Sequence, residues 1–406
     1  MSYTSYAMLV AVLLMPVFAT RKTPDPVQVV EEPAETKFGE TITFHARLIA
    51  QEPIEEVVIL ISAEGDNYTE TGVATLSADG QTSYEYQLGK HPLRAFSQIN
   101  YRYRVKLAGG EEFTTTFLKY YYEDNRFPWQ TLEEKPFRVH WYSGDIALAQ
   151  NVLDVARAGL ERVQSLVTVS QTEQQPVEIY IYAKAKDMQA TLSPSGQNWV
   201  AGHADPDLGV MVVALPNGPD QRLLMEQRIP HELMHIMLYR LTGSGYSHLP
   251  AWLNEGLAST AELYPNPDYQ VLLDSAYQEN GLLPISSLCD AFPRDASNAL
   301  LAYSQASSFT RFLHSVYGTS GMDDLVKSYA NGLDCRRGAE ASLGNNLTRL
   351  ERQWRQATFS ENASLTALNN LLPWLILLLA ALGGPLAATF IRLRNKPVAS
   401  KDYSTF

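Results

Sequence analysis

Cysteine is scarce in this chain of 406 residues, which has only Cys289 and Cys335. Two cysteines exclude a small fold stapled by several disulfides, and neither has the partners of a thiolate metal site or a catalytic thiol. In an oxidising compartment the two could form one disulfide, worth about 3 to 4 kcal/mol in the loop-entropy model. Two free buried thiols are the alternative, and the sequence leaves both open.

Basic residues are outnumbered, with 32 Lys and Arg against 44 Asp and Glu and a formal net charge of −12. No basic patch interrupts this balance, so no binding to nucleic acid is expected, because the phosphates would be repelled. Internal repeats and low-complexity stretches are also absent. The chain is long enough for two domains, and its hydrophobic content of 45% is that of an ordinary globular protein.

Two uncharged apolar runs lie near the ends of the chain. The run from Ala7 to Ala19 is too short for a membrane span, which needs about twenty residues, and predicts a signal peptide over residues 1–19. No Lys or Arg precedes this run, so an uncleaved anchor is the alternative. The run from Leu371 to Ile391 is long enough to be a transmembrane helix.

A basic tail, residues 392–406, follows the predicted transmembrane helix. By the positive-inside rule this tail is cytoplasmic, which places the folded domains on the extracytoplasmic side of a cell membrane that the chain crosses once. Its basic residues are Arg392, Arg394, Lys396 and Lys401.

Residues 26–123 predict an all-β domain. Short alternating or β-branched runs are separated by turn signals such as Asp79-Gly80, which is typical of an immunoglobulin-like or fibronectin-like sandwich. In Tyr101–Leu107 aromatic residues alternate with Arg and Lys, which we interpret as one core face and one solvated face, with a ligand-binding face as the alternative. The expected strands are Thr41–Leu48, Val57–Ile61, Tyr84–Leu88, Tyr101–Leu107 and Phe113–Tyr122.

Residues 129–358 predict a second domain of mixed α and β structure. Its last helices are expected to form a lobe that closes a cleft. The expected strands are Phe137–Tyr142, Val177–Tyr182 and Val210–Leu215, and the expected helices are Ile146–Val163, Ala299–Tyr317, Met322–Ala330 and Leu347–Ala357.

The most informative motif, His231 to His235, reads His-Glu-Leu-Met-His. Two histidines four apart on a helix project from one face, so both imidazoles can reach one ion, and zinc is the ion expected. Glu232 between them is placed to take a proton from water at the open position of the metal. An apolar stripe from Leu223 to Leu241 predicts that this helix is buried.

A second segment, Trp252 to Ala258, reads Trp-Leu-Asn-Glu-Gly-Leu-Ala and supplies Glu255 as the third ligand. The first helix is expected to end at Gly243, and the second to start after Pro250 and to stop before Pro265. The alternative is a pair of packed helices that carry two satisfied histidines and an ordinary glutamate.

These two motifs resemble those of the gluzincin zinc peptidases, the clan of thermolysin and aminopeptidase N, and in particular of bacterial surface proteins with a peptidase MA-like domain. The resemblance covers Trp129 to Ala357. It implies a thermolysin-like fold for this domain. It also implies that His231, His235 and Glu255 are zinc ligands and that Glu232 is the general base.

The chain departs from the gluzincin pattern in two places. It has no G-x-M-E-N segment, by which relatives of aminopeptidase N hold a free amine, so we expect an endopeptidase. Ser259 stands where thermolysin-like enzymes place an aspartate that orients a ligand histidine. The resemblance also implies an oxyanion donor from the helical lobe, for which Tyr303 is the candidate, ahead of His248 and His314. An ordinary packed tyrosine is the alternative for Tyr303.

Gly202 to Leu215 resembles the sheet edge on which gluzincins pair an extended substrate. His203 in this segment either lines the substrate cleft or is a satisfied surface histidine, and we favour the second interpretation. The predicted function is that of a membrane-anchored zinc metallopeptidase acting on peptide or protein substrates. The alternative is a surface adhesion or scaffolding protein with a vestigial zinc site, and the intact base and third ligand favour the enzyme.

Overall fold

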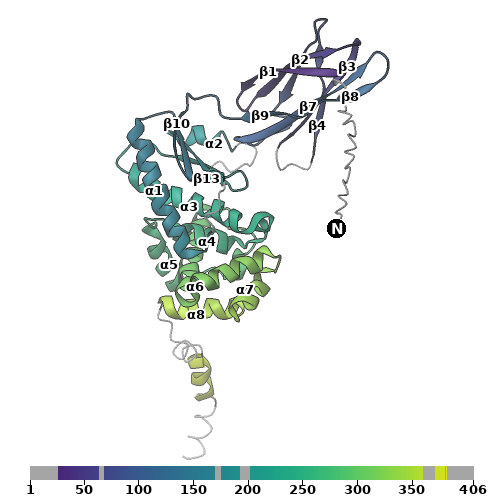
Figure 1. The fold of residues 1–406 in the computed structure, drawn as a ribbon. Helices are drawn as coiled ribbons and strands as arrows, with labels where there is room; N and C mark the ends of the chain where they lie inside the picture. Colours follow the sequence, from purple (N-terminus) through teal and green to yellow (C-terminus); the bar gives the residue numbers. More distant parts are fainter. Residues whose placement is uncertain are drawn as a thin grey trace, which may run out of the picture. The chain divides into compact units, whose positions relative to one another are not determined.

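The computed structural model of the chain describes residues 26–63, 68–169, 175–192, 202–359, 371–379 and 381. The fold divides into two compact units, Met1–Arg126 and Phe127–Phe406. In the described residues of the first unit the regular elements are all strands, whereas the second unit combines a sheet with many helices (Figure 1).

The first unit is a β-sandwich, which confirms the expected N-terminal β domain. Its strands are β1 Val27–Lys37, β2 Thr41–Ala50, β3 Ile54–Ala63, β4 Glu70–Val73, β5 Thr75–Leu76, β6 Gln81–Gln87, β7 Ser97–Leu107, β8 Glu112–Thr114 and β9 Leu118–Tyr122. One sheet has the order β1-β2-β6-β5 and the other β4-β3-β7-β8, and β9 also pairs with β7. The expected strand Phe113–Tyr122 is therefore two strands, β8 and β9, and β1 was not expected.

The core of the sandwich explains the alternating sequence of β7. Tyr101 and Tyr103 are almost fully buried, and the Tyr101 ring packs against Phe44 with centroids 4.6 Å apart. Arg102 points away from this core and lies over the Phe117 ring, 4.4 Å from its centroid. The interpretation of β7 as one core face and one outer face is confirmed.

The sheet of the second unit has five strands in the order β10-β11-β12-β14-β13. The strands are β10 Gln130–Glu134, β11 Phe137–Trp141, β12 Val177–Tyr182, β13 Gly202–Asp205 and β14 Val210–Ala214. The three central strands are parallel and both edge strands are antiparallel to their neighbours. The strand directly before the His-Glu-Leu-Met-His helix, β14, is thus interior, and β13 is the edge. Of the expected edge segment Gly202–Leu215, only β13 lies at the edge of the described sheet, because a turn ending at Gly209, with φ of 68°, folds β13 back beside β14.

Two long helices, α1 (Ile146–Leu166) and α3 (Gln221–Thr242), pack against each other and contact the sheet. The close approach depends on Gly159 of α1, because a Cβ there would lie 3.1 Å from side-chain carbons of Pro230 in α3. Asp145 caps the start of α1 by accepting a hydrogen bond from the backbone N–H of Ala147. The buried faces of α1 and α3 share one apolar core with the sheet.

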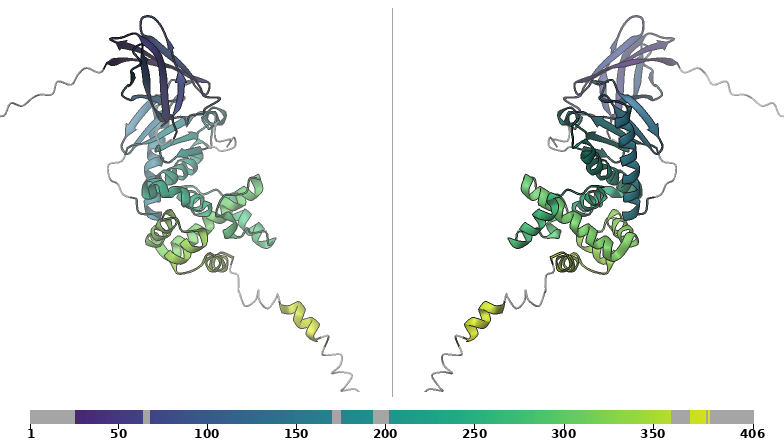
Figure 2. Two further views of the ribbon diagram at one scale, coloured as in Figure 1. Left: turned by 90° about the vertical axis from the view of Figure 1, so that its right-hand side faces the viewer. Right: turned by 90° about the vertical axis from the view of Figure 1, so that its left-hand side faces the viewer.

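Of the remaining helices, α2 (Ala185–Gln189) lies beside the sheet, and the others gather toward the C-terminal end of the second unit (Figure 2). These others are η2 Gly243–His248, α4 Ala251–Ala261, α5 Asp268–Gln278, η3 Ile285–Leu288, α6 Ala296–Ala330, α7 Cys335–Leu343 and α8 Leu347–Phe359. The expected helices Ala299–Tyr317 and Met322–Ala330 both lie in α6, which is broken between them at Gly318 (φ 65°). Gly256 lets α4 approach α6, since a Cβ there would lie 2.3 Å from Thr310 Oγ1.

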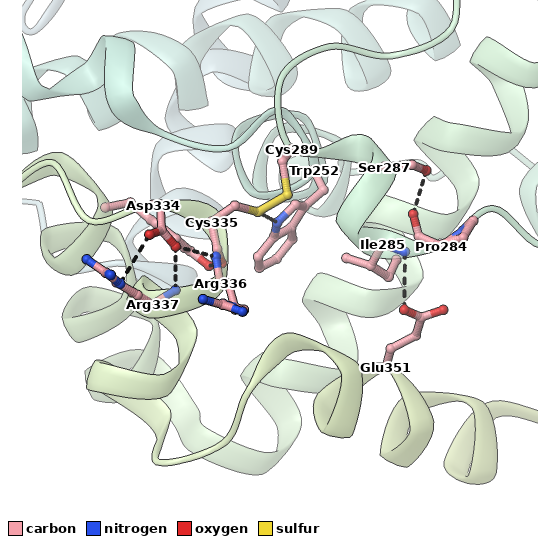
Figure 3. Close-up of a disulfide and its surroundings, with 11 residues drawn as sticks. Trp252, Pro284, Ile285, Ser287, Cys289, Asp334, Cys335, Arg336, Arg337 and Glu351 are labelled. Carbon is pink, nitrogen blue, oxygen red and sulfur yellow. Dashed lines mark hydrogen bonds and ion pairs between the residues drawn. A yellow bond between two sulfur atoms is a disulfide. The ribbon is translucent and has the colours of Figure 1, made fainter.

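Cys289 and Cys335 form a disulfide that joins the segment after η3 to the first residue of α7 (Figure 3). The indole N–H of Trp252, in α4, donates a hydrogen bond to Cys335 Sγ at 3.4 Å. Of the two alternatives for the cysteines, the fold therefore has the disulfide, and it lies against α4.

Three predicted segments lie wholly or largely outside the described residues: the signal peptide 1–19, the transmembrane helix 371–391 and the tail 392–406. Residues 371–379 are described and helical, with exposed apolar side chains. Within the described part of the chain, no helix has both the length and the apolar character needed to cross a bilayer.

Candidate active site

Helix α3 presents two histidines on the same face, one turn apart. His231 and His235 lie with their ring centroids 5.2 Å apart. His235 is buried, at 8% exposure, and His231 is partly buried. Gly159 of α1 packs against Pro230, immediately before His231, so the helix that carries the histidines is packed on the apolar core at this point.

Helix α4 brings Glu255 to the two histidines. Its Oε2 atom lies 3.5 Å from His231 Nε2 and 3.8 Å from His235 Nε2. The three donor atoms all lie within 4.8 Å of one another. Two imidazole nitrogens and one carboxylate oxygen form the donor set of a catalytic zinc site with an open position, so the residues fit this ion.

The Nδ1 nitrogen of each histidine ring, on the side away from Glu255, makes a hydrogen bond. His231 Nδ1 donates to Glu262 Oε1 at 3.2 Å, and His235 Nδ1 donates to Asn254 Oδ1 at 3.1 Å. The hydroxyl of Tyr246 lies 3.2 Å from the same His235 nitrogen and accepts a hydrogen bond from Asn254 Nδ2. With Nδ1–H committed in this way, Nε2 of each ring faces Glu255 and is the nitrogen left to bind a metal.

Opposite charges within this group shift the pKa values of His231 and Glu255. Burial by itself would lower the pKa of His231, but hydrogen bonds to Glu255 and Glu262 raise that pKa well above its ordinary value. Burial would raise the pKa of Glu255, but His235, His231 and a hydrogen bond from Tyr303 lower it. A metal ion binding here therefore has to displace a proton from His231.

Glu232 stands beside the three donors and lines the same cavity. Its side chain is 8% exposed, and its Oε1 approaches the backbone of β13 so closely that a Cβ on Gly202 would lie 2.7 Å away. The cavity has a volume of about 780 Å³. It is lined by Gly202, His203, Ala204, Pro206, His231, Glu232, His235, Tyr246, Ala251, Glu255, Ala291, Phe292, Pro293, Arg294, Ala299 and Tyr303.

Tyr303 of α6 also lines the cavity, and its ring packs edge-on against Phe292 with centroids 4.9 Å apart. Burial raises the pKa of its hydroxyl, and the negative charge of Glu255 raises it further, so the phenol keeps its proton at neutral pH. The two other candidates lie elsewhere. His248 bonds the carbonyl oxygen of Ala330, and His314 bonds that of Ser165.

His203 of β13 lines the cavity, although the sequence favoured an ordinary surface histidine. Its Nε2 lies 3.7 Å from Asp205 Oδ1. Burial alone would lower its pKa, but Asp205 and the nearby Glu232 raise it. The edge strand thus adds a basic side chain to the lining of the cavity.

Sequence reasoning missed Glu262, Asn254 and Tyr246. The positions of two of them relative to Glu255 in the sequence could have indicated their role. Asn254 directly precedes Glu255, and Glu262 follows Glu255 by seven residues, about two helical turns, at the cap that ends α4. Ser259, at the position where an aspartate was expected, is buried, and Glu262 makes the contact to His231 in its place.

Comparison with solved structures gives weak similarities. A mutant of a two-domain M1 zinc metallopeptidase bound to L-arginine shares 10% identity over 77% of this chain and 88% of its own, with a TM-score of 0.34. An M1 zinc metallopeptidase from Deinococcus radiodurans gives a TM-score of 0.32 at 10% identity, over the same shares of both chains. A β-1,3-glucan-binding module of carbohydrate-binding family 56 is 13% identical over 23% of this chain and 98% of its own, with a TM-score of 0.17.

No curated protein matches the chain. A family model does: the model of the peptidase MA superfamily matches residues 155–360, just over half of the sequence. The matched region contains α3, α4 and α6, and with them the two histidines, Glu232, Glu255 and Tyr303. The chain belongs to the peptidase MA superfamily.

Proposed function

We propose that this chain is a zinc metallopeptidase of the gluzincin type that hydrolyses bonds inside peptide or protein substrates. The observation that carries the proposal is the convergence of the His231, His235 and Glu255 donor atoms within 4.8 Å in one cavity that Glu232 also lines. Membership of the peptidase MA superfamily supports the same function.

The chain supplies the proton transfers through Glu232. A zinc ion bound at the three donors would provide Lewis-acid activation of water and of the scissile carbonyl. The Glu232 carboxylate accepts the proton of the attacking water and passes it to the amine nitrogen that leaves. Its low exposure keeps bulk water from competing for that proton.

Tyr303 is the proposed donor to the oxyanion. It keeps its proton at neutral pH, as its raised pKa requires, and its hydroxyl already lies within hydrogen-bonding range of Glu255. A donor fixed beside the reacting carbonyl stabilises the negative charge that develops there. The contact with Phe292 holds the ring in this position.

Strand β13 is the proposed support for an extended substrate. Within the described residues it pairs on one side only, with β14, and its residues Gly202 to Ala204 line the cavity beside Glu232. Backbone N–H and C=O groups on an unpaired edge can bind a peptide by strand addition. Together with the absence of an amine-anchoring G-x-M-E-N segment, this edge favours cleavage inside a chain.

The proposed location is the extracytoplasmic side of a cell membrane, with one transmembrane helix at 371–391. This rests on the sequence: the uncharged run, the basic tail and the apolar segment near the N-terminus. A disulfide between Cys289 and Cys335 is consistent with an oxidising compartment.

Zinc analysis of the purified full chain tests the ligand assignment. After dialysis against a mild chelator, we expect one zinc per wild-type chain. Glu255→Ala is expected to bind zinc at least about tenfold more weakly, since even second-shell partners change affinity by 10 to 100-fold. Full retention of zinc in Glu255→Ala would refute the assignment.

A further inference from the structure

The cavity has one strongly basic side chain, and the proposed chemistry does not use it. Among the described lining residues, Arg294 is the only Lys or Arg, and the only carboxylates are Glu232 and Glu255. Arg294 belongs to the segment between η3 and α6, which forms one wall together with Ala291, Phe292 and Pro293.

This wall segment is anchored at its start. Cys289 is bonded to Cys335 (Figure 3). The carbonyl oxygen of Cys289 accepts a hydrogen bond at 2.8 Å from the N–H of Ala251, the first residue of the ligand helix α4. A displacement of the segment would therefore have to break contacts with α4 and α7. These contacts hold the start of the segment in place.

The end of the segment is anchored as well. Asp295 caps α6, accepting a hydrogen bond from Asn298 N at 3.0 Å on one oxygen and one from Asn298 Nδ2 on the other. Between the two anchors, Phe292 packs on Tyr303. Arg294 is therefore carried by a short segment that is fixed to the elements of the active site at both ends.

The guanidinium of Arg294 is free to meet a ligand. The nearest carboxylate in sequence, Asp295, is committed to the helix cap. Within the described residues Arg294 makes no ion pair or side-chain hydrogen bond, and it is an exposed residue of the cavity lining. An arginine presents a rigid fork of donors that matches a carboxylate with two parallel hydrogen bonds.

The net charge of the whole chain disfavours a negatively charged ligand. This net charge of −12 repels acidic peptides at long range. A preference for acidic substrates would therefore have to arise locally in the cavity, and Arg294 is the side chain placed to create it.

We infer that Arg294 is a specificity-determining residue that binds a carboxylate of the substrate, either an acidic side chain near the scissile bond or the terminal carboxylate. The inference rests on the proposed peptidase function. It adds the substrate class: peptides that place a negative charge at the η3–α6 wall while their scissile bond lies at the metal donors.

Matched peptides separate the two sources of the carboxylate. The probes are N-acetylated, C-terminally amidated peptides with Glu, Gln or Lys at each position in turn, and one further set with Gln and a free C-terminus. For the wild-type full chain we expect a carboxylate at one location to raise kcat/KM about fivefold or more over the Gln amide. The peptide set that shows this gain in kcat/KM identifies whether the bound carboxylate is a side chain or the C-terminus.

Variants assign the preference to Arg294. The ratio of kcat/KM for the carboxylate peptide to kcat/KM for the Gln amide is expected to fall to about one in Arg294→Ala and to stay partly raised in Arg294→Lys. Arg294→Glu is expected to favour the Lys peptides. Arg349→Ala removes an exposed arginine of α8 that is not among the cavity residues, and should leave the ratio unchanged. A wild type without any carboxylate preference, or a preference that persists in Arg294→Ala, would overturn the inference.

A binding measurement separates this inference from the peptidase proposal. The same peptides, fluorescently labelled, are titrated into Glu232→Gln with and without Arg294→Ala, and their affinities are read by anisotropy. Tighter binding of the carboxylate peptides that is lost with Arg294 supports the inference even if the wild type cleaves nothing, an outcome that refutes only the peptidase proposal. Equal binding of the Glu and Gln peptides, or binding of neither, overturns the inference.

Discussion

At the scale of single residues, the donor atoms of the site are fixed by contacts made on the far side of the rings. Glu262 and Asn254 each hold one histidine nitrogen, so the opposite nitrogen faces Glu255. A carboxylate behind a ligand histidine also increases the basicity of the nitrogen that binds the metal. The affinity for zinc is therefore expected to depend on residues that do not touch the ion.

Glu262→Gln tests this dependence. The amide keeps the shape and the acceptor oxygen of Glu262 but removes its negative charge, so zinc affinity should fall about tenfold. The measurement is competition with a chromophoric chelator, with Glu161→Gln as the control, since Glu161 is an exposed residue of α1 outside the cavity. Equal affinities in wild type and Glu262→Gln would show that the contact at 3.2 Å has no influence on the metal.

Gly202→Ala tests the position of the general base. The new Cβ would lie 2.7 Å from Glu232 Oε1, so the carboxylate has to move while the zinc donors stay in place. We expect kcat to fall at least about tenfold with zinc retained, because a small misplacement of a catalytic group costs up to about 10²-fold. Gly218→Ala is the matched control, since its Cβ would meet nothing within 4 Å. Unchanged peptide cleavage by Gly202→Ala would contradict the proposed role of Glu232.

The sequence predicted the residues that form the site, but not all of those that support it. His231, His235, Glu232 and Glu255 follow from two motifs with a local physical reason: helical spacing and donor chemistry. The support of Arg294 depends on Cys289, Cys335 and α6, which are far apart in sequence and meet only in the fold. No local pattern predicts such contacts.

At the scale of elements, the hydrophobic periodicity of the sequence predicted the positions of strands and helices better than the order of the strands in the sheets. The expected strand Val177–Tyr182 has the observed bounds, because a run rich in β-branched and aromatic residues is typical of a strand. The polar edge strands β1 and β10 were missed, since their exposed residues carry little hydrophobic pattern. Strand order depends on pairing between segments, which is why the expected edge segment 202–215 proved to be an edge strand and an interior strand.

The packing of α8 on η3 gives a pH-dependent prediction. Glu351 of α8 accepts a hydrogen bond from the N–H of Ile285 at 3.2 Å, and burial raises its pKa above the ordinary 4.5 even though Ile285 and Arg355 lower it. A carboxyl whose pKa is raised on folding favours the folded state fully below its unfolded pKa, and this contribution is lost as the pH rises through the folded pKa. At neutral pH the charged Glu351 therefore destabilises the fold.

Glu351→Gln should remove this cost and keep the acceptor for Ile285. We expect the Tm of the variant minus that of the wild type to increase as the pH rises from 4 to 7, as measured by thermal unfolding. Glu340→Gln on the exposed side of α7 serves as the control and should show no such trend. A Tm difference that stays constant across this pH range would contradict the account of Glu351.

At the scale of the whole molecule, the sequence predicts that the β-sandwich unit and the peptidase unit face the same side of a membrane. Protease added to intact cells should remove both units and leave the basic tail at 392–406 protected. An antibody against the tail and one against the β-sandwich unit report the two ends separately. A tail that is cleaved while both units survive would reverse the orientation and place the disulfide in a reducing compartment.

The central claim is that Glu232 makes this fold an enzyme. The most direct measurement compares wild type and Glu232→Gln for zinc content and for cleavage of an N-acetylated peptide library. Glutamine keeps the shape and removes the proton acceptor, so the variant should hold one zinc per chain and lose at least about 10²-fold in activity. Chelation of the wild type should abolish its cleavage as well. A wild type that holds zinc and cuts nothing, or a Glu232→Gln variant that cuts equally well, would contradict the peptidase mechanism and favour an adhesion or scaffolding role.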